Sequence, residues 1–452
     1  MKNQFSLIIT ISFLFVGSLS AQTKNGDVLI KNGTLITVTN GTKENTDILI
    51  RNGKISNIGQ NLSAPSGVQV IDAAGKFVMP GIIDAHSHIA LDAVNESTSP
   101  VTAEVWTGDV LNPTDIGIYR ALAGGVTISH AMHGSANAIG GQNATIKHRW
   151  GSTKMDDIRM DGAPRTIKFA LGENPTRVHG EGSGLVPRTR MGVEQVFRRS
   201  FSEAKEYMEG WDEYNRDKNK RGYKGTPPTY DLRKEVVADI LRGNIIVHSH
   251  SYRADEILML MNVFKDYGIK KLVFQHANEA FKVAPEIAEF GAMASVFADW
   301  WAYKFEVYYS TAYNAAILAQ NGVTTSINSD SGELIRHLYH EAAKTQKYGR
   351  LTDEQALEMI TLNPAKQLGI DNRVGSLEVG KDGDVVIFNN HPLSIYAVPQ
   401  MTFVDGVKYF DIEKDEDDVR TYINAAEEVN VMGEMTEHEK CMTNTEWLFT
   451  NE

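Results

Sequence analysis

Short apolar runs alternate with amphipathic helical patterns through the middle of the chain, from about residue 81 to residue 374. Helical periodicity is clear in residues 253–268 and 312–322, each of which lies between two of the apolar runs. Strands that alternate with helices predict a parallel sheet, and about eight such units within roughly 250 residues predict a closed α/β barrel of the TIM type. An eighth predicted strand lies near residues 143–150, and seven others are evident in residues 81–88, 126–133, 166–173, 244–250, 271–276, 293–299 and 324–330.

β-rich segments flank this region on both sides. Residues 27–62 contain short β-forming runs separated by Asn-Gly pairs, which are strong hairpin signals. A similar pattern returns in residues 375–393 and 401–412. The two segments could form separate small units, but neither has enough strands to bury a sheet face alone, so we expect one β-sandwich built from both ends. The predicted division is a signal peptide (1–21), an N-terminal sandwich segment (22–80), the barrel (81–375), a C-terminal sandwich segment (376–412) and an acidic C-terminal tail (413–452).

The first residues carry the pattern of a secretory signal peptide. Lys2 precedes an apolar run over residues 7–16, and the small-residue stretch GSLSAQ follows as a cleavage region. The run is too short for a membrane-spanning helix of about 20 residues. We therefore expect an exported protein with no membrane anchor, which is periplasmic if the source is Gram-negative. Cys441 is the sole cysteine, so no intrachain disulfide can form.

Composition narrows the function further. The 452-residue chain carries a formal net charge of -12, which argues against a nucleic-acid partner. Residues 176–243 exceed an ordinary crossover between strands, and loops of that length commonly cover a functional site. We expect a small-molecule substrate, and the composition leaves room for a homo-oligomer.

Polar side chains stand at the ends of five predicted strands. In a barrel these ends meet at one rim, where the reactive side chains lie. Buried imidazoles and carboxylates need partners, so their convergence predicts a metal site. Nitrogen and oxygen donors suit zinc first, with manganese, iron or cobalt as alternatives, rather than calcium or magnesium. The residues concerned are His86, His88, Glu173, His248, His250, His276 and Asp330.

Several motifs of the chain resemble those of the amidohydrolase superfamily, metal-dependent hydrolases on a distorted barrel. The segments are PGIIDAHSH, TIKFALGENP, VHSHSYRADEI, VFQHANEAF, SINSDS, ITLNPAKQLGI and GSLEVGKDGDVVIF, and they occur in the order typical of the family. The chain is most similar to the imidazolonepropionase-like branch, which includes dipeptidases of the prolidase type. The stretch HGSANAIGGQNATIK is also similar to a motif of exported members of that branch.

The resemblance implies one or two divalent ions and a specific ligand set. The implied ligands are His86, His88, Glu173, His250, His276 and Asp330. At the fifth strand His248 is the alternative to His250, which we favour because an apolar helix residue, Ile257, follows it seven positions later. Lys168 could be a carboxylated bridging ligand in place of Glu173, but we favour Glu173 because Lys168 lies five residues before the strand end.

This ligand set predicts hydrolysis of a C–N bond in an amide, a cyclic amide or a dipeptide. A metal-held hydroxide would attack the carbonyl, while Asp330 would accept the proton and pass it to the leaving nitrogen. One alternative is a mononuclear deaminase on the same fold. Such relatives have a glutamate three residues after the fifth-strand histidine, where this chain has Arg253. A non-catalytic binding protein is the other alternative, and it would be expected to lack ligands that this chain has.

Candidate substrate-binding residues lie near the predicted rim or in the long covering segment. Guanidinium groups bind carboxylates through two parallel hydrogen bonds, so Arg253 and Arg188, together with Arg177 and Arg190, would suit a carboxylate-bearing substrate. Solvated surface charge is an equally good interpretation of these arginines. His133 could contact the substrate from the end of the second strand.

Overall fold

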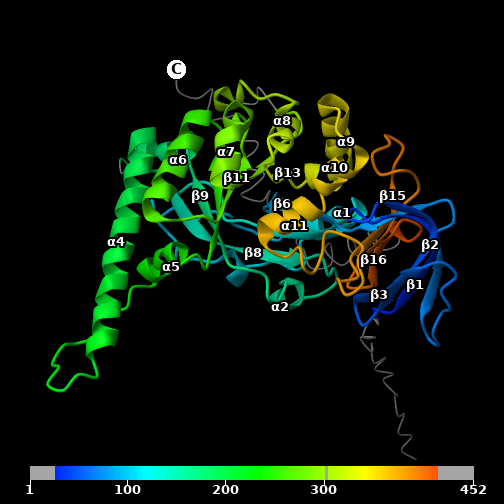
Figure 1. The fold of residues 1–452 in the computed structure, drawn as a ribbon, viewed down its shortest axis with the longest axis horizontal. Helices are drawn as coiled ribbons and strands as arrows, with labels where there is room; N and C mark the ends of the chain where they lie inside the picture. Colours follow the sequence, from blue (N-terminus) through cyan, green and yellow to red (C-terminus); the bar gives the residue numbers. More distant parts are fainter. Residues whose placement is uncertain (1–25, 183, 185, 301–303, 416–452) are drawn as a thin grey trace, which may run out of the picture.

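The computed structural model describes residues 26–182, 184, 186–300 and 304–415. The predicted signal peptide, Cys441 and almost all of the predicted acidic tail lie outside these residues. Figure 1 shows a barrel surrounded by helices, with a separate β-sheet domain on one side where the blue and orange parts of the chain meet.

The sheet domain combines strands from the two sides of the barrel sequence. Its strand order is β16-β15-β14-β5-β1-β2-β3, and β4 pairs with β1. Val386 of β14 pairs with Met79 of β5, so the late strands join the early ones directly. The expectation of one composite β domain is confirmed, as a single hydrogen-bonded sheet. Its strands are β1 (Val28–Ile36), β2 (Thr42–Arg51), β3 (Lys54–Gly59), β4 (Gln69–Asp72), β5 (Phe77–Pro80), β14 (Val385–Phe388), β15 (Pro399–Val404) and β16 (Val407–Asp411).

One of the Asn-Gly pairs forms the tight turn that the sequence predicts. Asn52 and Gly53 connect β2 to β3 with φ angles of 51° and 74°. Positive φ at both central residues is what a two-residue hairpin turn requires, and asparagine and glycine tolerate it best. The turn therefore fixes the register of this hairpin.

The barrel sheet has the strand order β6 to β13, and its seven evident strands match the predicted runs, with β10 extending one residue beyond its run to Ser251. The eighth strand, β8, lies where the sequence places it, but it runs antiparallel to both β7 and β9. Only residues 132–138 separate β7 from β8, too few for the crossover that a parallel neighbour needs. The strands are β6 (Ile82–Ser87), β7 (Val126–Ala131), β8 (Ile139–Lys147), β9 (Thr166–Ala170), β10 (Ile246–Ser251), β11 (Leu272–His276), β12 (Met293–Val296) and β13 (Thr325–Ile327).

The gap between the first and last barrel strands is filled by a short backbone segment. The Ile327 amide donates to the Met359 carbonyl, and the Ile83 amide donates to the Ile360 carbonyl, each at 2.9 Å. At the rim, the Asp330 amide donates directly to the His86 carbonyl at 3.1 Å. The barrel is therefore nearly closed, and its last strand end is tied to its first.

Helices cover the outside of the barrel, and α4 is much longer than the others. Its far end projects beyond the barrel (Figure 1), and together with α5 it accounts for much of the predicted covering segment. None of the described helices is both long and apolar enough to span a bilayer. The helices are α1 (Ile116–Ala123), α2 (Met155–Ile158), α3 (Glu173–Thr176), α4 (Arg190–Asp217), α5 (Leu232–Leu241), α6 (Ala254–Tyr267), α7 (Ala284–Phe290), α8 (Asn314–Gln320), α9 (Leu338–Gly349), α10 (Asp353–Glu358) and α11 (Leu362–Leu368).

A buried ionic cluster joins the barrel to the sheet domain. Lys147, the last residue of β8, is fully buried, and its Nζ lies 2.8 Å from Asp382 and 3.2 Å from Asp384. The same Nζ contacts Asp405, between β15 and β16. One lysine at the end of a barrel strand thus holds three carboxylates that belong to the sheet domain or lead into it.

Candidate metal centre

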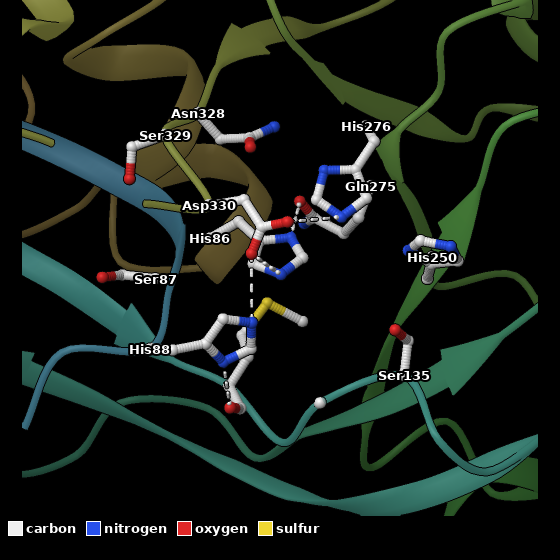
Figure 2. A network of polar contacts seen from close by, with 12 residues as sticks. His86, Ser87, His88, Ser135, His250, Gln275, His276, Asn328, Ser329 and Asp330 are labelled. Atoms are coloured by element: carbon white, nitrogen blue, oxygen red, sulfur yellow. Dashed lines mark hydrogen bonds and ion pairs between the residues drawn. The ribbon is translucent and has the colours of Figure 1, made fainter. Parts of the chain in front are cut away.

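Three imidazoles meet one carboxylate at the rim of the barrel. The Oδ1 atom of Asp330 lies 3.1 Å from Nε2 of His88 and 3.4 Å from Nε2 of His86. The Oδ2 atom lies 3.4 Å from Nε2 of His276. Figure 2 shows the three rings arranged around the carboxylate, and His86, His88 and Asp330 are close enough to share one ion. The predicted convergence of strand-end residues thus occurs for these four.

Hydrogen bonds on the far side of two rings determine which nitrogen faces Asp330. Nδ1 of His88 donates to the Met132 carbonyl at 2.8 Å, and Nδ1 of His86 faces the Gln275 oxygen at 3.1 Å. A neutral ring that donates through Nδ1 presents a lone pair at Nε2. The lone pair of a neutral His86 then faces both Asp330 and the Lys168 Nζ, which lies 3.0 Å away, and that of a neutral His88 faces Asp330. A lone pair that faces a carboxylate requires a proton or a metal cation between the two atoms.

The protonation properties of the buried histidines favour the metal cation. Burial lowers the pKa of His276 to about 3 and that of His86 well below its usual range, so both rings are neutral near pH 7. Nδ1 of His276 has no hydrogen-bond partner among the described residues although it is buried. Neutral imidazoles beside a carboxylate are the donor set of a divalent transition metal, so these residues fit such an ion.

The backbone is unusual at two of these residues. His276 and Asp330 have φ angles of 65° and 45°, in the left-handed region that residues other than glycine rarely adopt. Strained backbone of this kind persists only where the surrounding structure enforces it, and it is concentrated at functional sites. The strand ends are bent so that both side chains turn toward the same point.

The two histidines of β10 have different surroundings. The ring of His248 lies 4.5 Å from the His130 ring at a tilt of 60°, and its Nδ1 accepts from the Gln275 amide at 2.8 Å. His250 lies nearer the rim, with its ring 5.0 Å from that of His276. In Figure 2 it faces the group from the side opposite His88. His250 thus lies beside His276, whereas His248 contacts His130 and Gln275. The preference for His250 as the ligand stays a prediction.

The carboxylate expected to bridge two ions has other partners. Glu173 begins α3, and its side chain lies 3.3 Å from Lys304 and 3.5 Å from Arg177. Lys168, by contrast, is buried with its Nζ 3.0 Å from Nε2 of His86, and burial lowers its pKa to about 8. Lys168 thus lies beside His86, while Glu173 lies beyond the strand and is ion-paired. The choice between the two as bridging ligand stays a prediction.

The predicted substrate-binding residues have local partners instead. Arg253 precedes α6 and pairs with Asp255 through two 3.0 Å hydrogen bonds, and Arg188 donates to the Gly184 carbonyl at 3.1 Å. His133 is buried and accepts from the Glu96 amide at 2.9 Å through Nε2.

The other ring nitrogen of His133 also has a backbone partner. Its Nδ1 donates to the Gly134 carbonyl at 2.9 Å. Both nitrogens of the ring are thus satisfied by the backbone, and the substrate role of His133 stays a prediction.

The sequence interpretation missed residues that support the centre. Gln275 lies between His86 and His248, and Asp84 receives the His86 amide at 3.1 Å. Lys304 and Asn174 lie beside His250, with the Asn174 amide 3.4 Å from its Nε2. Gln275 and Asp84 could have been noticed as polar residues on strands that are otherwise apolar. No pattern in the sequence indicates Lys304.

A family model described as "Amidohydrolase family" matches residues 77–421. The chain belongs to the amidohydrolase family. It is 32% identical over 419 residues to the amidohydrolase tasK of Hapsidospora irregularis, a match that covers 85% of this chain and 40% of that protein. The chain thus spans less than half of that relative's length.

Solved structures give the same assignment. The crystal structure of an amidohydrolase from Thermotoga maritima MSB8 has a TM-score of 0.78 at 36% identity and covers 85% of this chain and 100% of its own. An adenosine deaminase from Xanthomonas campestris with bound zinc shares the fold, with a TM-score of 0.51 at 15% identity over 88% of this chain and 98% of its own. The resemblance inferred from the motifs is therefore confirmed at the level of the superfamily, whose members bind divalent metals.

Proposed function

We propose that the chain is a metal-dependent hydrolase that cleaves the C–N bond of an amide, a cyclic amide or a dipeptide. The observation that carries the proposal is the convergence of Nε2 of His86 and Nε2 of His88 on one oxygen of Asp330, at 3.4 and 3.1 Å, where the three side chains could share one ion. Family membership supports the reaction class. The proposed ligands are His86, His88, Lys168, His250, His276 and Asp330.

The protein's own residues supply proton transfer and orientation. A bound divalent ion would polarise the substrate carbonyl and lower the pKa of water. Asp330 is the carboxylate at the centre, so it can accept a proton from the attacking water and deliver it to the leaving nitrogen. Met132 and Gln275 hold the rings of His88 and His86 so that Nε2 faces inward.

Lys168 is proposed as the link between the His86 side and the His250 side of the centre. A lysine whose pKa is lowered to about 8 is partly neutral near pH 8, and a neutral amine can react with carbon dioxide to form a carbamate. The carbamate would supply the bridging oxygens that were expected from Glu173. Mass spectrometry of the intact native protein would detect the added carboxyl group.

Metal content and thermal stability test the proposal directly. We expect one or two zinc ions per chain by elemental analysis, and we expect zinc to raise the melting temperature of chelator-treated protein. His88→Ala should abolish this rise. His391→Ala should preserve it, because the His391 ring meets Phe77 edge to face at 5.4 Å and its nitrogens contact Asp353 and the Leu393 amide, each at 3.4 Å. A screen of dipeptides, N-acyl amino acids and lactams with the zinc-loaded protein should reveal hydrolysis. Failure of both the metal binding and the screen would refute the proposal.

The deaminase alternative is less well supported. Glu279, three residues after His276, could have served as its proton donor. Its carboxylate instead accepts from the Ala254 amide at 3.0 Å at the start of α6 and pairs with Lys282 at 3.0 Å. Release of ammonia from adenosine or adenine by the zinc-loaded protein would favour the deaminase.

Export is proposed from the sequence alone. N-terminal sequencing of the protein purified from its native source should begin near residue 22 if the signal peptide is removed.

A further inference from the structure

We infer that Lys304, Asn174 and Ser135 form a subsite for a substrate carboxylate next to the metal centre. The inference rests on the proposed function and narrows its substrate to a C–N bond whose nitrogen carries an α-carboxylate, as in an N-acyl amino acid or the last residue of a dipeptide. In such a molecule the carboxylate is two bonds from the nitrogen that leaves.

The three side chains form a connected group on the His250 side of the centre. The Asn174 amide nitrogen donates to the Ser135 hydroxyl at 2.7 Å and lies 3.4 Å from Nε2 of His250. The Asn174 oxygen accepts from the Lys304 ammonium at 3.3 Å. Since Ser135 accepts from Asn174, its own hydroxyl hydrogen points elsewhere, and Figure 2 shows the Ser135 oxygen directed toward His250.

Aromatic packing positions the Lys304 ammonium beside the histidines. Its Nζ lies 4.4 Å from the centroid of the Tyr252 ring, and that ring lies 4.4 Å from the ring of His250. A cation over an aromatic face is held in place without losing its charge. Phe297 stacks on His276 at 4.8 Å and on Trp300 at 4.7 Å, so an aromatic wall stands near the same position.

Lys304 has carboxylate neighbours, but each of them has a second cation. Glu173 lies 3.3 Å from Lys304 and is also 3.5 Å from Arg177. Glu306 lies 3.6 Å from Lys304 and is closer to Arg190, at 2.7 Å. Both carboxylates thus stay paired if Lys304 turns to a substrate.

Two of the arginines that the sequence suggested for this role are already paired with carboxylates. Arg190 is held by Glu256 and Glu306, and Arg253 by Asp255. Lys304 is the cation whose partners include Asn174, which itself contacts His250. A carboxylate that contacts Lys304 and the Ser135 hydroxyl would place the adjoining amide toward the histidines.

The test compares N-acetyl-L-phenylalanine with N-acetyl-L-phenylalaninol, which replaces the carboxylate by a neutral hydroxymethyl group. With zinc-loaded full-length protein, we expect kcat/KM for the acid to exceed that for the alcohol by about ten-fold or more. Lys304→Met should raise KM for the acid relative to KM for the alcohol, so that the ratio of the two kcat/KM values falls to about one, and Lys304→Arg should restore most of the preference.

Lys282→Met is the matched control, because Lys282 lies 4.6 Å from the centroid of the Tyr309 ring and pairs with Glu279 but does not contact Asn174. It should retain the preference for the acid. Equal rates for the acid and the alcohol in the wild type, or an equal loss of both in Lys304→Met, would overturn the inference.

Calorimetric binding of N-acetyl-L-phenylalanine separates the two proposals. Binding that Lys304→Met weakens about ten-fold, without hydrolysis, would support the subsite and count against the hydrolase. Hydrolysis of neutral amides without any preference for the acid would support the hydrolase and refute the subsite. Absence of both binding and hydrolysis of the acid would refute the subsite.

Discussion

Asp84 and Ser329 are joined by two hydrogen bonds across the closure of the barrel. The Ser329 amide donates to one carboxylate oxygen of Asp84 at 3.2 Å, and the Ser329 hydroxyl donates to the other at 2.5 Å. Asp84 is fully buried and also receives the His86 amide. Since His86 follows on β6 and Asp330 comes directly after Ser329, this contact links the proposed ligands of the first strand to the proposed ligand of the last.

Ser329→Ala should therefore disturb both stability and metal binding. It leaves one oxygen of a buried carboxylate without its hydroxyl donor, and an unsatisfied buried group costs about 1–3 kcal/mol. We expect the free energy of unfolding in urea to fall by that amount and zinc affinity to weaken. Ser202→Ala is the control, because Ser202 bonds Tyr267 at an exposed position. Equal effects of the two variants would contradict the linking role of Ser329.

Asp330→Asn should remove turnover while the histidines remain in position. The amide keeps the shape of the carboxylate but accepts a proton poorly, so kcat should fall by about 10²–10⁴-fold. Bound metal, counted by elemental analysis, should stay nearly unchanged. Asp299→Asn removes a carboxylate that pairs with Lys344 at 2.8 Å and should keep its turnover. Turnover retained in Asp330→Asn would exclude Asp330 from proton transfer.

The polar residues at the strand ends were predictable from the sequence because titratable side chains there follow directly on runs that are otherwise apolar and buried. His86, His88, His276 and Asp330 each follow an apolar run, and a barrel brings such positions to one rim. Gln275 and Asp84 were not predicted because a single polar residue on a buried strand has many structural explanations. The structure identifies them only through their partners.

The sequence could not show how close the side chains of Lys168 and Glu173 come to the histidines at the rim. Glu173 comes closer to the strand end than Lys168, so counting residues favoured it. The side chain of Lys168, however, is long enough to bring its Nζ from the interior of β9 to within 3.0 Å of His86. The direction of β8 was missed for a related reason, since an isolated apolar run does not reveal its orientation. Lys304 lies far from any motif and depends wholly on tertiary packing.

Lys147→Met should weaken the attachment of the sheet domain to the barrel. The methionine would leave Asp382, Asp384 and Asp405 close together without the cation that they share. Removing one partner of a buried ion pair typically costs about 3–5 kcal/mol, measured as the free energy of unfolding in urea. Arg199→Met is the control because its pair with Glu203 is on the exposed surface of α4, where such pairs contribute about 0.5 kcal/mol. A loss in Lys147→Met no larger than in this control would show that the cluster does not hold the domains together.

The same cluster should make stability depend on pH through Asp384. Burial raises the pKa of Asp384 from 3.8 to about 6, although Lys147 opposes the shift. Between about pH 4 and pH 6 the folded protein therefore holds a proton that the unfolded chain has released, so this contribution to stability is lost as the pH rises. The side chain in Asp384→Asn does not titrate, so this pH-dependent contribution is absent from the variant. The wild type should lose stability relative to this variant when urea unfolding is compared from pH 4 to pH 7.

Asp382 serves as the internal contrast. Burial raises its pKa, but Lys147, Lys54 and Arg373 together outweigh burial and lower the pKa to about 2. The contribution of Asp382 to stability is therefore present above about pH 4 and is lost as the pH falls toward 2. Asp382→Asn should therefore change the pH dependence below pH 4, and Asp384→Asn should change it between pH 4 and pH 6. A constant difference between Asp384→Asn and the wild type over the higher range would mean that the buried carboxyl is ionised throughout and that Lys147 outweighs burial.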